Sequence, residues 1–543
     1  MRELYAGTAR RDFPSPRHDA MASFPPLSGA NGRSSAVDII LSDDTLRLVF
    51  LLGHAQSSAP ATLSDERASR FLLWFALEGW RRYPDVNFSA DYLDFLSAPI
   101  PPCASRLATY VLFTKPELRS RFSGDVERFH DWYYDGGAES LGLSPFLSAR
   151  ERDVRRAAQQ RDPGGFKKAG FSRVPGVNIF GFGDSIMGVG EDARALAAAL
   201  RYANIPCALI NLSLPSDGVT DVAPALDLPK TSRPIFPINI FTLPPFETAR
   251  LRIERGRALF QDRYSIGYWP WELTSLPDHW KSVFDLVDEV WAASDFLEKV
   301  YSGLTDKPVI LMPPHVHIPD DEPVDLSLFG LSRDDFIVLS MFDYNSFIAR
   351  KNPDGALAAF QKAFPSHGKE KLIIKTINAD AHPDAARHLA TLAAGEKRCV
   401  IINKPLSRAQ ILGLIKQSAC FISLHRAEGF GRVIAEAMAL GTPVAATDWS
   451  GSACFLDATR GYPVSYALRD VEAGEYPFRD GSQWAEPSIA DAANKLRVVR
   501  ANRDPAITSR ARAFIRDHYG IERVASKLTE RLKAIEPRVS SRQ

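Results

Sequence analysis

Short apolar runs alternate with amphipathic stretches along most of the chain after about residue 174. GVNIFGFG (176–183) has the apolar character of a buried strand, and EDARALAAALRYA (191–203) places its apolar residues on one face of a helix. Helical stretches separate most of five further runs that have the same strand character. These runs are CALINL, FPINIFTL, YSIGYW, EVWAAS and PVILMPP. The alternation predicts a parallel sheet covered by helices.

A second alternating set starts near residue 335. FIVLSMFD (336–343) predicts a strand, and PDGALAAFQKAF (353–364) predicts a helix with Pro353 at its first position. The strand runs that follow are KLIIKTIN, CVIIN, ACFISLH and PVAAT. Two such sets predict an α/β protein with two doubly wound, Rossmann-like domains facing a cleft, where ligands bind beyond the carboxyl ends of the strands.

The expected domain boundaries follow from these changes of pattern. We place the first Rossmann-like domain at 174–325, the second at 326–505, and C-terminal helices that brace both at 506–535. The linker AQQRDPGGFKKAG (158–170) separates them from the preceding part of the chain.

Residues 37–165 lack the strand–helix alternation, which predicts a mostly helical accessory domain. RFLLWFALEG (70–79) and RFHDWYYDGG (128–137) share Arg, Phe, Trp, an aromatic residue and Gly at matching places. This faint two-fold repeat places Trp74 and Trp132 at equivalent core positions of two helical units. The alternative is that these tryptophans stack on a sugar or a partner.

Composition excludes several classes of protein. Lys and Arg (66) nearly equal Asp and Glu (65) among 543 residues, which argues against a nucleic-acid partner. The five cysteines are far apart, without metal-site or disulfide spacing, so a reducing cytoplasm fits best. No apolar run has the length of a membrane span. Residues 1–36, rich in Pro, Ser, Arg and Gly, are expected to be a disordered leader.

The stretch HRAEGFGRVIAEAMALGTPVAAT (425–447) carries the clearest chemistry. Glu428 and Gly431 bound a turn between a predicted strand and a helix, where glycine lets a ligand approach the backbone and the helix start attracts an anion. Glu428 is itself negative, so it suits a hydroxylated group beside a phosphate. Glu436 follows about 2.2 turns later, on nearly the same side of the helix. Two acceptors around a diphosphate suit a nucleotide sugar; the alternative is that both are solvated surface acids.

EGFGRVIAEAMALGTPVAAT resembles the signature of retaining GT-B glycosyltransferases of family 4. FDYNSFIARKNPDGALAAFQKAF (342–364) resembles the phosphate-binding segment of that family, and GFGDSIMGVGEDARALAAAL (181–200) resembles its N-domain glycine loop. YWPWELTSLPDHW, VDEVWAASDF and GEYPFRDGSQWAEP resemble the branch that assembles bacterial polysaccharides and lipopolysaccharides. The resemblance covers about 174–535, and it implies that 174–325 is the acceptor domain and 326–505 the donor domain.

The resemblance implies roles for the residues around the first acid. Glu428 would contact hydroxyls of the donor sugar, and the backbone of Phe430 and Gly431 would contact the same sugar or its phosphate. Glu436 would bind the ribose. Ser450-Gly-Ser452 would lie near the nucleotide.

The resemblance also implies a clamp on the donor diphosphate. Lys351 and Arg350 would neutralise the charge that builds up as the phosphate departs, a large term in such catalysis. The alternative is a solvated pair at a helix start. The family often has an arginine about six positions earlier, where Ser346 would donate a hydrogen bond instead. Gly188 and Gly190, just before the helix expected from residue 191, would let the first domain approach the phosphate.

Three further residues have two interpretations each. Glu272 stands where family members carry a histidine, and it is either a general base or acceptor-orienting acid or an ordinary helix N-terminal residue. His315 follows the last strand of the first domain, and His425 ends the strand before Glu428. Each of the two histidines either faces the cleft or is structural.

These residues and the resemblance predict a retaining glycosyltransferase without metal or cofactor. It would move a hexosyl unit from a nucleoside diphosphate sugar, with GDP-mannose favoured over UDP-glucose, to a glycan or lipid-linked oligosaccharide. A dinucleotide site is disfavoured because Ile186 stands where the third glycine of that fingerprint belongs. The alternatives are a sugar-nucleotide epimerase, a glycan synthase or a non-catalytic sugar-nucleotide-binding scaffold. Residues 37–165 would dock to a membrane complex, dimerise or brace the catalytic part, which leaves open a peripheral location at the cytoplasmic membrane.

Overall fold

The computed structural model describes most of the chain after residue 34. The described residues are 35–54, 64–83, 85–86, 88–98, 105–122, 129, 132–147, 176–185, 188–212, 229–231, 233–256, 259–318, 323–332, 334–366, 368–479 and 481–541. The expected leader, apart from Ser35 and Ala36, and the expected linker at 158–170 lie outside them.

The described residues divide into two compact units, and we describe each by itself. A parallel-sheet unit contains the described residues of Phe171–Thr248 and Phe260–Gln543. A helical unit contains those of Thr8–Gly170 and Ala249–Leu259.

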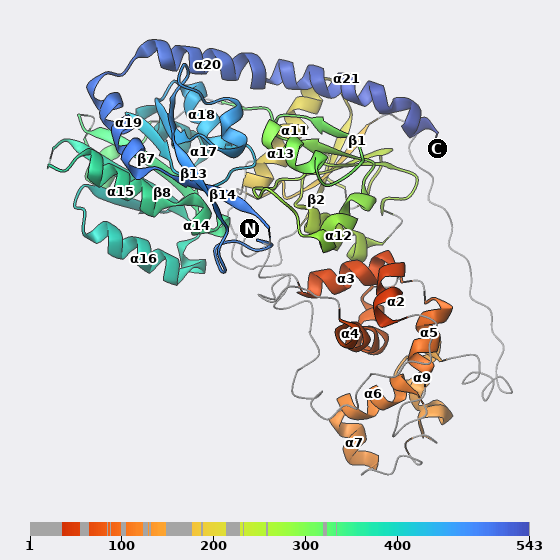
Figure 1. Cartoon of the computed structure of the whole chain (residues 1–543). Coiled ribbons are helices and arrows are strands. Elements are labelled where there is room, and N and C mark those ends of the chain that lie inside the picture. The colour runs from red at the N-terminus through yellow and green to blue at the C-terminus, as the bar shows by residue number, and fades with distance from the viewer. Residues whose placement is uncertain are drawn as a thin grey trace. The chain divides into compact units, whose positions relative to one another are not determined.

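The first domain of the parallel-sheet unit, which contains β1 and β2 of Figure 1, is built on six parallel strands. Their order in the sheet is β2-β1-β3-β4-β5-β6. The strands are β1 (Val177–Gly181), β2 (Cys207–Asn211), β3 (Ile238–Phe241), β4 (Tyr264–Gly267), β5 (Glu289–Ala292) and β6 (Val309–Leu311). The helices between them are α11 (Gly188–Tyr202), α12 (Pro245–Arg255) and α13 (Asp295–Ser302). The part of α12 from Ala249 onward belongs to the helical unit. Val177 aligns with both Cys207 and Ile238, so the carboxyl ends of the central strands reach one edge of the sheet.

The second domain is built on another six parallel strands, in the order β12-β11-β10-β7-β8-β9. The strands are β7 (Phe336–Asp343), β8 (Glu370–Ile377), β9 (Cys399–Asn403), β10 (Cys420–Ser423), β11 (Val444–Thr447) and β12 (Tyr462–Val464). The helices are α14 (Ile348–Lys351), α15 (Pro353–Ala363), α16 (Pro383–Ala394), α17 (Arg408–Gln417), α18 (Arg432–Leu440) and α19 (Ile489–Ala501). The two predicted Rossmann-like domains are therefore confirmed.

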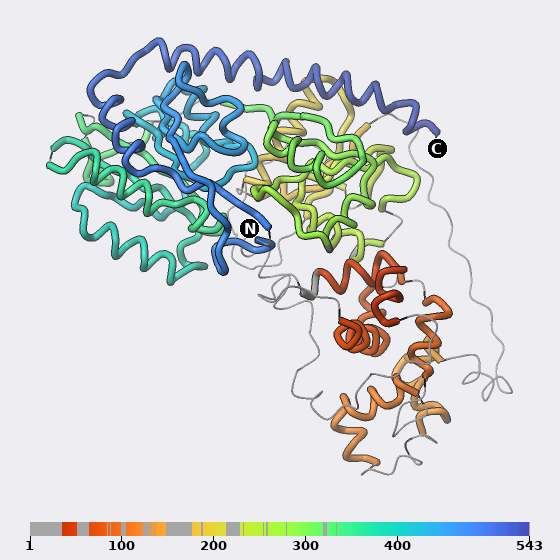
Figure 2. Tube along the Cα trace, in the orientation of Figure 1, coloured from red at the N-terminus to blue at the C-terminus, as the bar shows by residue number. Residues whose placement is uncertain are grey.

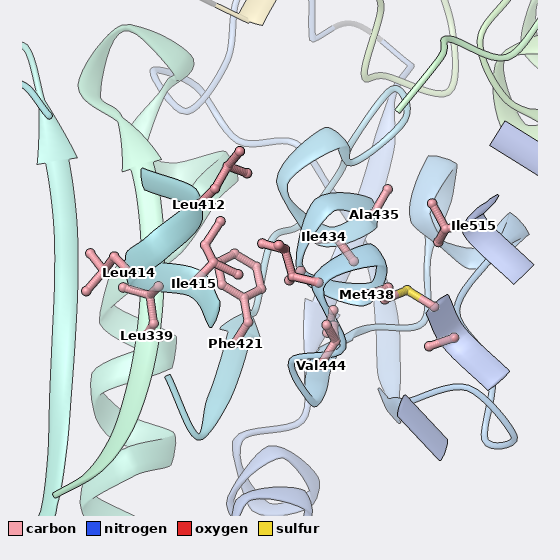
Figure 3. Packing of buried hydrophobic residues seen from close by; sticks show 14 of the residues in the cluster. Leu339, Leu412, Leu414, Ile415, Phe421, Ile434, Ala435, Met438, Val444 and Ile515 are labelled. Carbon is pink, nitrogen blue, oxygen red and sulfur yellow. The ribbon is translucent and has the colours of Figure 1, made fainter. Parts of the chain in front are cut away.

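Apolar residues from several elements form the core beside the second sheet. Figure 3 shows Leu339 of β7, Ile415 of α17, Phe421 of β10 and Met438 of α18 in one cluster. These side chains are nearly or fully buried. Burying a side chain of this size contributes about 1.5–3 kcal/mol, so this cluster fixes how α17 and α18 lie on the sheet.

A two-stranded antiparallel hairpin extends from the second domain, and the sequence pattern did not predict it. It pairs β13 (Tyr466–Asp470) with β14 (Gln483–Pro487), and Tyr466 lies opposite Pro487. The first of these strands has mostly exposed side chains, so it lacks the apolar run by which the other strands were found.

Two C-terminal helices connect the domains of the parallel-sheet unit. α20 (Pro505–Tyr519) contacts α18 of the second domain, and α21 (Ile521–Ser540) contacts α11 of the first, as the continuous blue trace in Figure 2 shows. On α21, Arg531 forms an ion pair with the fully buried Glu289 of β5. Glu289 also accepts hydrogen bonds from Tyr264 Oη (3.0 Å) and Trp291 Nε1 (2.8 Å).

The helical unit confirms that a mostly helical region precedes the two sheets. Its longer helices are α2 (Ala36–Ser42), α3 (Asp44–His54), α4 (Asp65–Leu77), α5 (Ala90–Ser97), α6 (Arg106–Thr114) and α7 (Pro116–Phe122). Trp74 is buried on α4, whereas Trp132 is half-buried and precedes a π-helical turn, Tyr133–Gly137. The two tryptophans of the faint repeat thus differ in burial, and Trp132 adjoins a π-helical turn.

We expect Arg531→Met to lower the free energy of unfolding of the parallel-sheet unit by about 2–3 kcal/mol, because it leaves the buried Glu289 carboxylate without its counter-charge. Urea unfolding followed by tryptophan fluorescence measures this. The matched control is Arg516→Met, which removes an exposed ion pair with Asp517 and should leave the unfolding midpoint unchanged. Equal stability of Arg531→Met and the wild type would contradict the bracing role of this ion pair.

Candidate active site

A cavity of about 220 Å³ lies between the two parallel-sheet domains. Most of the predicted site residues line it, although they come from segments far apart in the sequence. Those that line it are Gly188, Glu272, Ser346, Arg350, Lys351, Glu428, Phe430 and Gly431. Gly190, His315, His425 and Glu436 are outside its lining. The structure therefore brings together the predicted phosphate clamp and the first of the two predicted acids.

The clamp residues are held on a four-residue helical turn that follows β7. Phe347, with φ of 62°, precedes α14, and Asn352, with φ of 50°, ends it. The Asn352 side chain accepts from the Gly355 amide (3.1 Å) and donates to the Leu424 carbonyl (2.9 Å). The two left-handed residues are costly for non-glycine side chains, so the bonds of Asn352 are what keep the turn in place.

Glu428 lies between both clamp residues. Lys351 Nζ donates to Oε1 of Glu428, and Arg350 Nη1 lies 3.3 Å from Oε2. Arg350 is almost completely buried, and it also donates to the Ala427 carbonyl (2.8 Å) and the Ser346 carbonyl (3.2 Å). A buried guanidinium with two carbonyl acceptors and a carboxylate partner is fixed in orientation.

These contacts set the charges at the cavity wall. Burial favours the neutral form of Glu428, but Lys351 and Arg350 outweigh it and lower the pKa of Glu428 to about 2. Burial also opposes the charge of Arg350, yet Glu272 and Glu428 raise the pKa of Arg350 above its usual value. Burial lowers the pKa of Lys351, opposed by Glu428. The cavity wall thus carries an ionised carboxylate held between cations at neutral pH.

The glycine turn after β10 brings the two domains into contact. A Cβ on Gly429 would lie 2.6 Å from the Trp271 carbonyl of the first domain, so only glycine fits there. Ser294 Oγ, also from the first domain, donates to the Gly429 carbonyl (2.6 Å). Gly431 has a φ of 90° and precedes α18. Phe430 lines the cavity while its ring packs on Phe455 and Tyr519, outside the cavity lining.

The second predicted acid has a partner of its own. Glu436 is buried, and Arg408 of α17 donates to both of its oxygens, at 2.5 Å and 3.0 Å. Glu436 is therefore not a solvated surface acid. Glu428 and Glu436 each pair with cations, but with different ones.

Arg432 and Asp192 form an ion pair between the domains, and the sequence interpretation missed both. Arg432 Nη2 lies 2.5 Å from Asp192 Oδ1 of α11, and Nη1 donates to the His315 carbonyl (3.2 Å). Arg432 and Asp192 both line the cavity. Arg432 is the first residue of α18, where the positive end of the helix dipole disfavours a cation. This unfavourable position was the one sequence signal that Arg432 has a specific acidic partner.

The start of α11 differs from the sequence expectation. The helix begins at Gly188, so Gly188 and Gly190 lie in its first turn rather than before it. A Cβ on Gly190 would lie 2.3 Å from the Ser185 carbonyl, whereas a Cβ on Gly188 would meet nothing within 4 Å. Gly190 is thus required by packing against the preceding loop, and only Gly188 leaves room toward the cavity.

Glu272 is in the loop after β4 and in no helix, so its interpretation as a helix N-terminal residue is wrong. It is buried, accepts a hydrogen bond from Tyr476 Oη (2.5 Å), and lies 3.7 Å from Arg350 Nη2. The contact between Tyr476 and Glu272 could not be found from local sequence, because the two residues are 204 positions apart.

Both candidate histidines are buried. His425 is within hydrogen-bond distance of Ser423 Oγ (3.0 Å) and Ser452 Oγ (3.1 Å) through its two ring nitrogens. His315 has no hydrogen-bond partner for its ring among the described residues. Burial lowers the pKa of each histidine to about 4, so both are neutral at pH 7. Ser450 Oγ accepts from the Glu428 amide (2.9 Å), which fixes the backbone of the acid.

Within the described part of the chain, no group of three His, Cys, Asp or Glu side chains is arranged to hold a metal ion. Among the helices that the structure describes, none is long and apolar enough to cross a membrane.

The match to a protein family lies within the second domain. Residues 333–457 match the family model described as "Glycosyl transferases group 1". This match indicates a glycosyltransferase. It contains Lys351, Glu428 and Glu436, and it leaves the first domain and the helical unit outside. No curated protein matches the sequence significantly.

Solved structures are similar over both domains. Sucrose-phosphate synthase from Thermosynechococcus elongatus has a TM-score of 0.50 at 15% identity, and the match covers 67% of this chain and 99% of that one. Anabaena Alr3699/HepE, solved with UDP and glucose, has a TM-score of 0.49 at 14% identity and coverages of 66% and 100%. S. aureus TarM has a TM-score of 0.40 at 14% identity, and the chain spans about half its length (54% and 55%). The similarity to the synthase agrees with the GT-B fold expected from the sequence.

We expect the titration of His425 to make the free energy of unfolding depend on pH. Since burial lowers the pKa of His425 from about 6.5 to about 4, the unfolded state binds the extra proton, and stability falls as pH drops through that window. We expect His425→Gln, which keeps a donor and an acceptor for the two serines, to lose less stability between pH 7 and pH 5 than the wild type. The difference is at most about 1.4 kcal/mol per pH unit.

The measurement is urea unfolding of the wild type and of His425→Gln at both pH values. A loss in His425→Gln as large as in the wild type would contradict a buried, neutral His425.

Proposed function

We propose that this chain is a retaining glycosyltransferase that moves a hexosyl unit from a nucleoside diphosphate sugar to a glycan or lipid-linked acceptor in cell-surface polysaccharide synthesis. The observation that carries the proposal is the contact of Lys351 and Arg350 with Glu428 at the wall of the interdomain cavity. It supplies cations and an ionised acceptor within one site. A pyrophosphate with an attached sugar requires both.

The cations suit the departure of the leaving phosphate. Negative charge develops on the phosphate as its bond to the sugar breaks, and fixed cations directed at that charge lower the barrier. Arg350 is held by Glu428 and by the Ala427 carbonyl, so its position is set before any ligand arrives. Lys351 is partly exposed and can reach the ligand directly.

The carboxylates suit hydroxyl groups. Glu428 stays ionised well below neutral pH and accepts hydrogen bonds, which fits sugar hydroxyls beside the phosphate. Glu436 would accept hydrogen bonds from the ribose hydroxyls. Arg408 donates to both oxygens of Glu436, so it must share or release that carboxylate when the ribose binds. Gly188 and Ser346 line the cavity and leave room beside the diphosphate.

Retention of configuration and the favoured donor rest on the family resemblance. We propose front-face substitution, in which the acceptor oxygen bonds to the anomeric carbon as the phosphate leaves, and the leaving phosphate takes the acceptor proton. GDP-mannose is the favoured donor, and UDP-glucose is the alternative that a donor panel separates. No metal ion or other cofactor is required in this scheme.

The test is release of nucleoside diphosphate by purified protein given GDP-mannose or UDP-glucose and a glycan acceptor. We expect Lys351→Ala and Glu428→Gln each to lower kcat about 100-fold or more, because each removes a group from the transition-state site. The control is Lys362→Ala on α15, an exposed lysine in the same domain. Wild-type turnover by Lys351→Ala and Glu428→Gln would remove this site assignment.

Calorimetric titration with GDP and UDP separates the alternatives. Binding of a nucleotide without turnover of any donor favours a sugar-nucleotide-binding scaffold. Release of the nucleoside diphosphate without an acceptor favours an epimerase-type GT-B enzyme.

A further inference from the structure

An arm of the second domain crosses to the first domain beside the cavity. The arm consists of the described residues of 466–487, which are β13, β14 and the loop between them. Its loop residue Phe478, with φ of 57°, packs against three aromatic rings of the first domain. These are Phe246, Trp271 and Trp280, at ring-centroid distances of 5.8, 6.3 and 5.8 Å. Aromatic contacts of this kind stabilise the arm against the first domain.

Hydrogen bonds add to this contact. Ser482 Oγ lies 2.9 Å from Ser275 Oγ, and the Gln483 amide donates to Thr274 Oγ1 (2.9 Å). The arm therefore meets the loop of the first domain that carries Glu272.

The arm is also anchored firmly to its own domain. Arg469 of β13 pairs with Glu475 (2.6 Å) and with Glu486 of β14 (2.8 Å). Arg426, three residues after β10, pairs with the same Glu486 (2.7 Å). Both arginines lie over the buried ring of Trp484, at 5.3 Å and 6.0 Å. These linked ion pairs hold the arm at a defined angle, which a flexible loop could not keep.

Tyr476 of the arm contacts the catalytic machinery through Glu272. Its hydroxyl donates to Oε2 of Glu272 (2.5 Å), and its ring lies 4.6 Å from Phe347, the residue that starts the clamp turn. The other carboxylate oxygen of Glu272 lies 3.7 Å from Arg350 Nη2. A carboxylate of the first domain is thus inserted between two groups of the second domain.

This insertion determines where Arg350 lies. On one side Arg350 meets Ala427 and Glu428 of its own domain, and on the other it meets Glu272. Since Glu272 is held by Tyr476, loss of that hydroxyl leaves the carboxylate free to turn away from the guanidinium.

We propose that Tyr476 is a positioning residue: it orients Glu272, and Glu272 in turn orients Arg350 toward the leaving phosphate of the donor. The inference rests on the proposed function. It assigns to Glu272 a role through Arg350 in place of the general-base role considered from the sequence.

The variant Tyr476→Phe removes one hydroxyl and keeps the ring contacts with Phe347 and Trp484. We expect kcat to fall about tenfold, the loss of roughly 1.4 kcal/mol of transition-state stabilisation, while the KM for the acceptor changes little. The control is Tyr466→Phe in β13 of the same arm, which is partly exposed and packs on Trp449. It should keep wild-type kcat. Wild-type kcat in Tyr476→Phe would overturn the proposal.

A double-mutant cycle tests whether the hydroxyl acts through Arg350. Arg350→Lys keeps the charge but loses the planar fork that Glu272 and Glu428 engage. If the two residues act in one relay, Tyr476→Phe lowers kcat no further in the Arg350→Lys background. Losses that multiply would show independent effects and overturn the relay. Thermal unfolding of each variant verifies that it is folded.

Amide hydrogen exchange gives a readout that needs no donor. We expect the segment 268–276 to exchange several-fold faster in Tyr476→Phe and at the wild-type rate in Tyr466→Phe. If the wild type turns over no donor, the proposed function fails, and the contact is judged by exchange alone. Unchanged exchange in Tyr476→Phe would then overturn the positioning of Glu272 by Tyr476.

Discussion

The structure of the cleft depends on the burial of one guanidinium. Arg350 is almost fully buried, and an ion in the protein interior must find counter-charges and hydrogen-bond acceptors in place of water. Its partners come from two domains: Glu428 and the Ala427 carbonyl from the second, and Glu272 from the first. The charge of Arg350 is therefore fully compensated only when the two domains meet. The buried charge of Arg350 therefore links the contact between the two domains to the position of this side chain.

Two features hold the domains in that arrangement by different chemistry. The C-terminal helices contact both domains, with the Arg531–Glu289 ion pair securing α21 to β5. The arm contacts the loop that carries Glu272 through aromatic rings and short hydrogen bonds. The helices act through an apolar face and a buried ion pair, whereas the arm reaches the clamp itself. For this reason a change in the arm affects the positions of Glu272 and Arg350 more directly than a change in α21.

Much of the fold followed from local pattern, and the exceptions have physical reasons. β7 was predicted at its observed bounds because eight residues of mainly apolar character end at a polar turn. β13 was not predicted because most of its side chains are exposed, so it lacks an apolar run. Arg469 of this strand pairs with Glu475 and Glu486, and no local pattern indicates these contacts. The family resemblance placed the glycines of α11 in a loop before the helix, whereas they lie in its first turn, where packing against the Ser185 carbonyl admits no side chain at Gly190. In the site, Lys351 and Glu428 could be named from the sequence, but Tyr476, Arg408 and Asp192 could not. Their partners lie on other elements, distant in sequence.

The cations at the cleft each have a carboxylate partner, and this balance affects how an anion can bind. At the cavity wall, Lys351 and Arg350 contact Glu428, and Arg432 contacts Asp192; Arg408 contacts Glu436 outside the cavity lining. Under the proposed function, the donor diphosphate would share these cations with the carboxylates. Each carboxylate relieved of a cation would regain an acceptor oxygen, and a sugar or ribose hydroxyl is a neutral donor that satisfies it without adding charge. A ligand that carries phosphates and hydroxyls together would then fit these paired charges better than inorganic phosphate, which supplies no such donor.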